Sequence, residues 1–471
     1  NGGIAANTTA GFALATGTYI ALLDHDDVLY PNALYESVKT LQSQGAELVY
    51  SDEIVLSADL KQLGGYHFKP DFAPDYLRGV NFITHLAVFS RALLDRAGAY
   101  ESSEYDGAQD HDLMLRLTEQ TTRDKIAHIK KVLYIWRGHA GSTAAGMEAK
   151  PYALAAGVRA IDAQLQRLNL PGKAMQVEDA PGAFQVRYEL TGHPLVSVMI
   201  PNKDHIDDLR RCMESIEEKS TYRNYEYIIV ENNSTEASTF DYYENAQKRD
   251  PRIKIATWKH EFNFSKLMNF GAQHARGEFL PRLNNGTEVR SPSWIESMLG
   301  ICQEPSVGAV GAKLYYRDET IQHAGVYVQG TGAGHLNSSL DRNEKGYYHT
   351  ASSTREVSAV TAACVLTKRE AFDEAGGFSE EFAVAFTDVD FCLKLRATGY
   401  SIVFAPEAEL YHYESLSRGY ETTIAKQMRF HREASLLNAT WPEYFVMGDP
   451  FMNRNLHPNC GYFRLDDRDL D

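Results

Sequence analysis

Two stretches of the sequence decide the fold. Residues 9–27 read TAGFALATGTYIALLDHDD, and residues 269–287 read NFGAQHARGEFLPRLNNGT. They align without a gap at one offset (284 − 24 = 260). In each, a helical pattern ends at a glycine, an apolar strand follows, and a polar turn closes the strand.

A second pair of segments lies downstream in the same order. Asp110-x-Asp112 matches Asp388-x-Asp390, again at a constant offset (388 − 110 = 278), and each follows an Asp-x-Ala-Gly stretch. Chance resemblance between two strand-to-turn segments explains one matched block, but it explains two ordered blocks poorly. The pattern therefore predicts two copies of one α/β domain.

The two copies differ in their opening half. Residues 196–204 read VSVMIPNKD, a helical pattern covers Leu209–Ile216, and residues 227–234 read YIIVENNS, which together predict a βαβ unit. The first copy begins with a helical pattern at residue 4 and has no room for such a unit. We expect a partial domain over residues 1–170, a linker over 171–192, and a complete domain with a C-terminal tail over 193–471.

Composition limits the class of protein. The chain has 471 residues, and 47 Lys and Arg against 63 Asp and Glu give a net charge of −16, which argues against a nucleic-acid groove. No apolar run reaches the roughly 18 residues of a spanning helix. The five cysteines are widely spaced without a C-x-x-C pattern, so reduced thiols in a cytoplasmic protein are expected. The chain starts Asn1-Gly2-Gly3 without a methionine, which suggests a fragment that begins inside a domain.

Acidic clusters follow the predicted strands. In open α/β sheets, ligands bind beyond the carboxyl ends of the strands, where Asp24-His25-Asp26-Asp27 falls. Three carboxylates in four residues need a cation, and Mg²⁺ or Mn²⁺ fits their oxygen ligands. A solvated turn that caps the next helix explains the same composition equally well. The repeat and the second acidic block favour the metal.

The second acidic block suggests a general base. Asp110 and Asp112, like Asp388 and Asp390, precede an apolar helical pattern. One carboxylate of each pair can cap its helix. The other can take a proton from an attacking hydroxyl group.

Taken together, these motifs resemble the family 2 glycosyltransferases, enzymes of the GT-A fold that use nucleotide sugars. The resemblance covers nearly the whole chain. It is most specific to tandem bacterial enzymes of the rhamnosyltransferase and O-antigen type through five segments: Gly308–Leu314, Ile321–Gly325, Val357–Cys364, Phe386–Cys392 and Tyr411–Ser415.

The resemblance implies a role for individual residues. Asp110 and Asp388 would be the catalytic bases. Asp24 and Asp26 would hold the metal and the diphosphate, with His139 as a further metal contact. The residues implied in nucleotide-sugar binding by the second domain are Pro201, Asn202, Asp204, Glu231, Asn284, Asn285 and His412.

The implied reaction is an inverting transfer from a nucleotide-diphosphate sugar, with rhamnose as the expected sugar. The implied acceptor is a glycan or lipid-linked glycan of surface-polysaccharide assembly, at the inner face of the plasma membrane with peripheral membrane association. A sugar-nucleotide hydrolase or epimerase has little support, because no dinucleotide-binding glycine fingerprint appears.

The second copy departs from the family pattern. Its acidic motif reads Asn284-Asn285-Gly286, and glycine has no side chain to bind a cation. Pro281 and Arg282 stand in the preceding strand, where apolar residues are expected and proline is poorly placed. A non-catalytic pair of domains that binds nucleotide sugars or carbohydrate therefore remains the alternative function.

Overall fold

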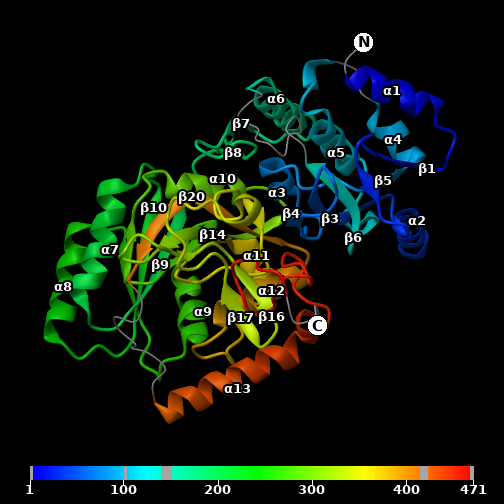
Figure 1. Ribbon diagram of the computed structural model, residues 1–471. Coiled ribbons are helices and arrows are strands. Elements are labelled where there is room, and N and C mark those ends of the chain that lie inside the picture. Colours follow the sequence, from blue (N-terminus) through cyan, green and yellow to red (C-terminus); the bar gives the residue numbers. More distant parts are fainter. Residues whose placement is uncertain (1–3, 100–102, 139–150, 414–422, 467–471) are drawn as a thin grey trace. The chain divides into compact units, whose positions relative to one another are not determined.

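The computed structural model describes residues 4–99, 103–138, 151–413 and 423–466. The chain folds into two compact α/β units. In Figure 1 the N-terminal part of unit 1 is blue to teal, and the main part of unit 2 is green to orange. Unit 1 comprises Asn1–Arg187 with Pro450–His457 and Leu465–Asp471, and unit 2 comprises Tyr188–Asp449 with Pro458–Arg464.

Unit 1 is a mixed sheet with helices packed against it. Its helices are α1 (Ile4–Leu14), α2 (Ala33–Gln44), α3 (Pro74–Gly79), α4 (Arg91–Ala97), α5 (Gln109–Glu119) and α6 (Pro151–Arg167). Its strands are β1 (Tyr19–Ala21), β2 (Val28–Leu29), β3 (Leu48–Ser57), β4 (Leu63–His67), β5 (Ala87–Ser90), β6 (Ile126–Gly138), β7 (Gly172–Gln176) and β8 (Phe184–Tyr188).

Unit 2 is larger. Its helices are α7 (Ile206–Lys219), α8 (Ala237–Arg249), α9 (Phe264–His274), α10 (Trp294–Cys302), α11 (Arg369–Glu374), α12 (Thr387–Ala397), α13 (Ile424–Thr440) and α14 (Pro442–Val446). Its strands are β9 (Val196–Asn202), β10 (Tyr225–Glu231), β11 (Ile253–Thr257), β12 (Phe279–Leu283), β13 (Thr287–Val289), β14 (Val307–Tyr315), β15 (Ile321–His323), β16 (Val326–Gln329), β17 (Gly332–His335), β18 (Arg355–Glu356), β19 (Cys364–Lys368) and β20 (Ser401–His412).

The sheet topology confirms the duplicated α/β architecture. Unit 1 has the strand order β1-β5-β3-β6-β2, and unit 2 repeats it as β12-β19-β14-β20-β13 with the same parallel and antiparallel pairings. Unit 2 adds the parallel strands β9, β10 and β11 beside β12. These are the βαβ strands that the sequence predicts for the second copy alone.

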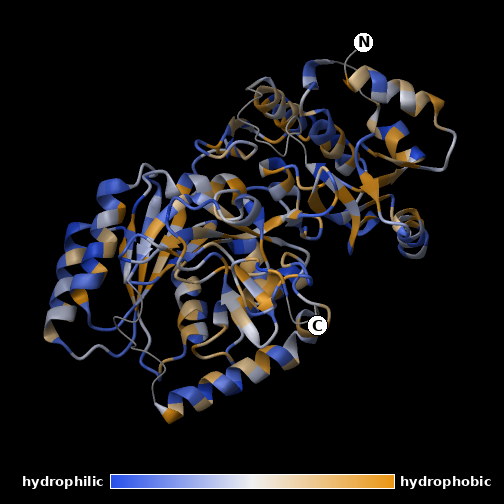
Figure 2. Ribbon diagram, viewed as in Figure 1, coloured by the Kyte–Doolittle hydropathy of each residue, from blue (hydrophilic) through white to orange (hydrophobic). Residues whose placement is uncertain are grey.

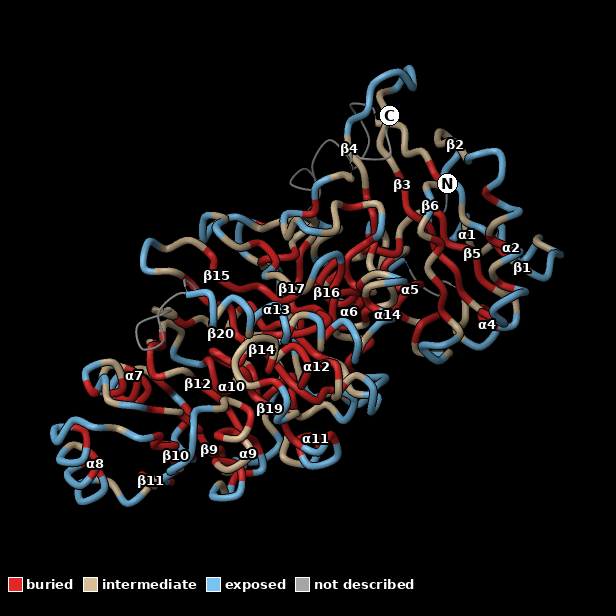
Figure 3. Tube along the Cα trace, turned by 90° about the horizontal axis from the view of Figure 1, so that it is seen from below, coloured by how far each residue is buried: buried red, intermediate tan, exposed pale blue. Residues whose placement is uncertain are grey.

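The parallel half of unit 2 is deeply buried because it packs against helices. Every residue of β10 is buried, and α7 packs Leu209, Cys212 and Ile216 inward at helical spacing. Figures 2 and 3 show the result, with apolar, buried strands at the centre and the polar, exposed surface of α8 outside. Buried apolar side chains of the strands, α7 and α10 form the core of this unit.

Pro281 and Arg282 do lie in the central strand β12. Toward β9, Phe279 pairs with Val196 and Arg282 pairs with Met199, whereas Leu280 and Pro281 have no pair on that side. Proline has no N–H to donate, and Pro281 pairs instead with Leu366 of β19. The Arg282 guanidinium is fully buried and lies 4.8 Å from the Phe372 ring centroid, with two further phenylalanine rings at similar distances.

The unit boundaries differ from those expected from the sequence. The segment expected as a linker forms the β7–β8 hairpin of unit 1, and Phe184 of this hairpin packs against Gly157 in α6. Part of the expected tail also belongs to unit 1, where the Asn453 amide donates to the buried Asp52 carboxylate at 3.0 Å.

Candidate active sites

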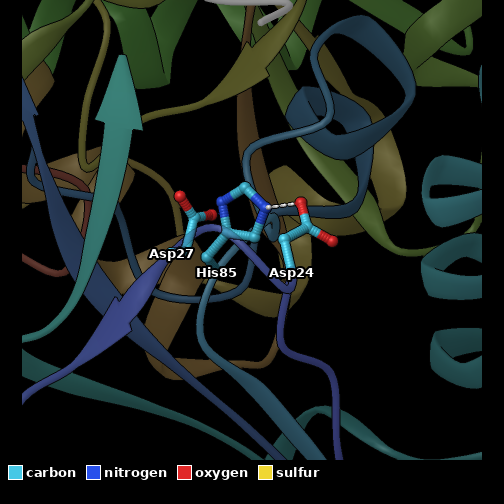
Figure 4. Close-up of side chains that lie close together, drawn as sticks. All are labelled: Asp24, Asp27 and His85. Carbon is cyan, nitrogen blue, oxygen red and sulfur yellow. Dashed lines mark ion pairs between the residues drawn. The ribbon is translucent and has the colours of Figure 1, made fainter. Parts of the chain in front are cut away.

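The acidic turn of unit 1 lies between β1 and β2. It brings Asp24 and Asp27 beside His85, which precedes β5, and ligand atoms of the three side chains lie within 4.8 Å of one another. Figure 4 shows His85 between the two carboxylates, with its Nε2 atom 3.8 Å from Oδ2 of Asp24.

Asp27 is fixed by the neighbouring strand β6. The Tyr134 hydroxyl donates to Oδ2 of Asp27 at 2.5 Å, and the backbone N–H of Arg137 donates to Oδ1 at 2.8 Å. Burial and this carboxylate raise the pKa of Tyr134, so the phenol remains a donor. Asp27 is thus held in place while Asp24 keeps much of its surface in solvent.

His85 is also held in place, by a buried carboxylate. Its Nδ1 atom lies 2.8 Å from Oε2 of Glu53, and its ring stacks on Tyr134 with centroids 4.5 Å apart. Although burial opposes ionisation, Lys69 and His85 hold the pKa of Glu53 well below its ordinary value. Burial likewise opposes the charge on His85, but Glu53 raises the pKa of the imidazole.

Asp110 lies near the same turn. It stands at the N-terminus of α5, where the Asn81 amide donates to its Oδ2 atom at 3.1 Å. Partial burial raises the pKa of Asp24; His85 opposes the rise, and Asp27, Asp26 and Asp110 add to it. The carboxylate of Asp110 therefore acts electrostatically on the acidic turn.

The second aspartate of each Asp-x-Asp pair is structural. Asp112 is buried and pairs with Arg116 at 2.9 Å. In unit 2, buried Asp390 accepts hydrogen bonds from Ser379 at 2.6 Å and Trp441 at 2.9 Å. One carboxylate of each pair is thus used in packing, which leaves Asp110 and Asp388 for the proposed chemistry.

The donor set in unit 1 fits a divalent cation. Ligands on opposite sides of an octahedral ion at roughly 2.1 Å each are about 4.2 Å apart, close to the observed separations. Asp26, which precedes Asp27 in the same turn, is not one of the three clustered residues; its Oδ1 atom lies 3.7 Å from Nδ1 of His25. His139 lies outside the described residues, so its part in this site stays a prediction.

Unit 2 joins three of its predicted nucleotide-binding residues, Asn202, Glu231 and Asn285, in one hydrogen-bonded network. Buried Asn202 donates to Tyr243 at 2.8 Å and accepts from Asn285 at 2.8 Å, and Tyr243 donates to Glu231 at 2.8 Å. Pro201 lies in β9, paired with Val230. These residues stand at the carboxyl ends of β9, β10 and β12.

The side chain of Asp204 binds the backbone that leads into α8. Its Oδ1 atom accepts hydrogen bonds from the backbone N–H groups of Thr235 at 2.9 Å and Glu236 at 3.0 Å. These groups precede α8, and they lower the pKa of Asp204 although slight burial opposes the shift. The carboxylate therefore orders the start of α8.

His412 contacts Asn284, the first residue of the Asn284-Asn285-Gly286 turn. The Asn284 amide lies 3.1 Å from Nε2 of His412, and Gln322 lies 2.7 Å from Nδ1 of the same ring. Burial lowers the pKa of His412 to about 4. The imidazole is neutral near pH 7 and acts as a hydrogen-bond partner, with no positive charge.

Asp388 begins α12 and accepts from the backbone. The N–H of Ala362 donates to its Oδ2 atom at 2.9 Å. Burial lowers the pKa of His335, and the charge of Asp388 opposes part of that shift. His335 contacts His323, whose own pKa is lowered by burial and by the neighbouring His335.

Three residues of the unit 1 site escape sequence reasoning. The sequence pattern includes Asp27 in the acidic turn but assigns it no role, and it assigns no role to His85 or Glu53. A comparison of the two copies would have pointed to His85 and Glu53, because both are replaced in unit 2. The strand register places Ala363 at the position of His85 (85 + 278 = 363) and Leu314 at the position of Glu53 (53 + 261 = 314).

Comparison with known proteins identifies the family. The family model described as "Glycosyl transferase family 2" matches residues 1–97 and 197–376, more than half of the chain and parts of both units. The chain belongs to this family.

Two curated relatives that match most of this chain are longer than it. This chain is 42% identical over 461 residues to the uncharacterized protein y4gI of Sinorhizobium fredii. The aligned region covers 97% of this chain and 50% of that relative. The chain is 40% identical over 422 residues to the O-antigen biosynthesis protein RfbC of Myxococcus xanthus, which covers 88% of the chain and 32% of that relative. The chain thus spans half or less of the length of each.

More distant similarities are shorter or weaker. An N-acetylglucosaminyl-diphospho-decaprenol L-rhamnosyltransferase of Mycobacterium tuberculosis is 31% identical over 85 residues, 18% of the chain and 27% of that relative. A crystal structure of GalNAc-T7 with UDP, GalNAc and Mn²⁺ overlays with a TM-score of 0.45 at 14% identity, covering 58% of this chain and 52% of that one. Among the described residues, no helix is long and apolar enough to cross a membrane.

Proposed function

We propose that this chain is part of an inverting glycosyltransferase that moves a sugar from a nucleotide-diphosphate donor to a growing surface polysaccharide. Family membership and the likeness to RfbC support the class and the pathway type. Rhamnose is the proposed sugar, supported by the shorter likeness to a rhamnosyltransferase. The observation that carries the proposal is the cluster of Asp24, Asp27 and His85, whose ligand atoms lie within 4.8 Å of one another.

In unit 1, Asp24, Asp27 and His85 would hold a divalent cation. When bound, the cation neutralises charge on the departing nucleoside diphosphate. Mn²⁺ suits this donor set better than Mg²⁺, because Mg²⁺ takes oxygen ligands and His85 offers nitrogen. Asp110 would accept the proton of the acceptor hydroxyl as it attacks the anomeric carbon, and Asn81 keeps that carboxylate oriented.

In unit 2, the same roles fall on different residues. Glu231, Asn202 and Asn285 would position the nucleotide through the network at the ends of β9, β10 and β12. Asp388 would be the base, and His412 would contact the donor as a neutral group. The acceptor is proposed as a lipid-linked glycan at the inner face of the plasma membrane, reached by peripheral association.

A non-catalytic role for unit 2 is the second candidate. Strand register places Asn284, Gly286, Thr287 and Ala363 where unit 1 has Asp24, Asp26, Asp27 and His85. Each substitution removes a side chain that binds cations well. Unit 2 would then hold a nucleotide sugar or a glycan while unit 1 performs the transfer.

The test is a panel of nucleotide sugars offered to the purified protein, with and without Mn²⁺. We expect transfer from one of the nucleotide sugars, and dTDP-rhamnose is the expected donor. This transfer should require Mn²⁺ and should be lost in Asp110→Asn. Transfer that survives in the double variant Asp110→Asn/Asp388→Asn would contradict the assignment of the bases. Binding of the nucleotide sugar without transfer, by a folded protein and with a suitable acceptor, would favour the non-catalytic role.

A further inference from the structure

The two ring nitrogens of His85 have different surroundings. Nδ1 lies 2.8 Å from Oε2 of Glu53, whose side chain is 3% exposed. Nε2 lies 3.8 Å from Oδ2 of Asp24 on the acidic turn. One nitrogen is thus bound to a buried carboxylate, and the other faces the predicted metal position.

Glu53 is itself immobilised from several sides. Its Oε1 atom accepts from Thr84 at 2.9 Å and lies 2.9 Å from Nδ1 of His67 and 3.7 Å from Nζ of Lys69. Lys69 also donates to the backbone carbonyl of His85. The carboxylate that orients His85 therefore has little freedom to move.

Stacking fixes the plane of the imidazole. The His85 ring lies on Tyr134 at an interplanar angle of 12°, and the hydroxyl of Tyr134 donates to Asp27. The same tyrosine thus aligns His85 and Asp27, so the relative placement of these two donors is set by one side chain.

This arrangement is typical of a histidine that binds a metal. Such a histidine usually donates its second ring N–H to a carboxylate, which selects the tautomer and holds the ring in the ligating orientation. We propose that Glu53 is a positioning residue that makes His85 the nitrogen ligand of the divalent cation in unit 1. This inference rests on the proposed metal-assisted function of the same site.

Unit 2 shows that the fold does not need the His85–Glu53 pair. The equivalent strands form with the same order and pairing, yet Ala363 and Leu314 stand at the two positions. Both residues are buried and apolar in unit 2. A buried ionic pair that is absent from the copy without acidic ligands is better explained by the site than by folding.

The experiment measures Mn²⁺ binding by electron paramagnetic resonance on the purified chain, without substrate. Pulsed spectra report nitrogen coupled to the bound ion. We expect a nitrogen signal in the His139→Gln variant, its loss when His85→Gln is added to that variant, and Mn²⁺ affinity reduced tenfold or more in His85→Gln and in Glu53→Gln. His25→Gln is the matched control, since His25 neighbours Asp24 but is 97% exposed, and it should bind Mn²⁺ as before.

Three outcomes overturn the inference. These are a His139→Gln spectrum without nitrogen, a nitrogen signal that persists when His85→Gln is added to His139→Gln, and unchanged Mn²⁺ affinity in a folded Glu53→Gln. If Glu53→Gln does not fold, as circular dichroism would show, His85→Gln alone decides.

Asp24→Asn separates this inference from the proposed metal site. If Asp24→Asn abolishes Mn²⁺ binding and His85→Gln does not weaken it, the ligand role of His85 fails and the metal site stands. If Asp24→Asn leaves Mn²⁺ binding unchanged, or if the natural sequence binds no Mn²⁺, the proposed metal site fails together with the role of His85.

Discussion

Replacing Glu226 with glutamine should remove a large share of the stability of unit 2. Glu226 lies in β10 and is 1% exposed. Its carboxylate accepts from Ser197 at 2.8 Å and from Arg276 at 2.8 Å, and it pairs with Lys254 at 3.0 Å. The residue thus connects β9, β10 and the turn that leads into β12, the three strands that carry the predicted nucleotide-binding residues.

The size of the effect follows from the pKa of the group. Although burial opposes ionisation, Arg276 and Lys254 lower the pKa of Glu226 from 4.5 to about 2. That difference corresponds to about 3 kcal/mol of folding free energy. Because the folded-state pKa is depressed, this contribution is complete above pH 4.5 and is lost as the pH falls toward 2, with roughly half remaining near pH 3.

Urea unfolding of unit 2 at several pH values tests this. Glu226→Gln should lower the free energy of unfolding by about 3 kcal/mol at pH 7, and the deficit should shrink as the pH falls below 4.5. Glu244→Gln, which removes an exposed carboxylate paired with Lys248, is the control and should change nothing measurable. A deficit under about 1 kcal/mol at pH 7, or one independent of pH, would refute the reasoning.

Three further predictions concern single residues. Asp204→Ala should destabilise unit 2 by about 1–2 kcal/mol through the start of α8, whereas Asp204→Asn should cost less; equal losses in denaturant titrations would contradict the capping role. Asp112→Asn should destabilise unit 1 by about 3 kcal/mol, because it removes the carboxylate that pairs with the Arg116 guanidinium. Asp110→Asn should leave thermal unfolding unchanged and stop transfer by unit 1; the reverse pattern would exchange their roles. Gly157→Ala should destabilise unit 1 by about 1–3 kcal/mol, because the Cβ atom of the alanine would lie 2.4 Å from the Phe184 ring. Alanine has the better helix propensity, so higher stability by calorimetry would show that the hairpin does not pack on α6 at this position.

Much of the fold was accessible from the sequence because the duplication is visible in local patterns. The glycine stop, apolar strand and polar turn around Asp24 and Asn284 recur at constant spacing, and the structure places them in β1 and β12 with equivalent neighbours. The βαβ opening of unit 2 was also readable, since its buried parallel strands form near-continuous apolar runs.

The site was less accessible because sheet order brings distant segments together. His85 and Glu53 lie far from Asp24 in the sequence, and they approach it only because β5 inserts between β1 and β3. Residues 171–192 looked like a linker because a short hairpin buries little of its own surface. The packing of Phe184 onto Gly157, which joins that hairpin to α6, has no local sequence signal.

The central claim is that unit 1 holds a divalent cation at its acidic turn and that unit 2 has no equivalent site at Asn284. Anomalous diffraction at the manganese edge, from a crystal soaked with MnCl₂ and a nucleoside diphosphate, tests it most directly. The account predicts a peak within coordinating distance of Asp24 and Asp27, and no peak beside Asn284. A peak beside Asn284, or none at Asp24 in a crystal where the nucleotide is bound, would contradict it.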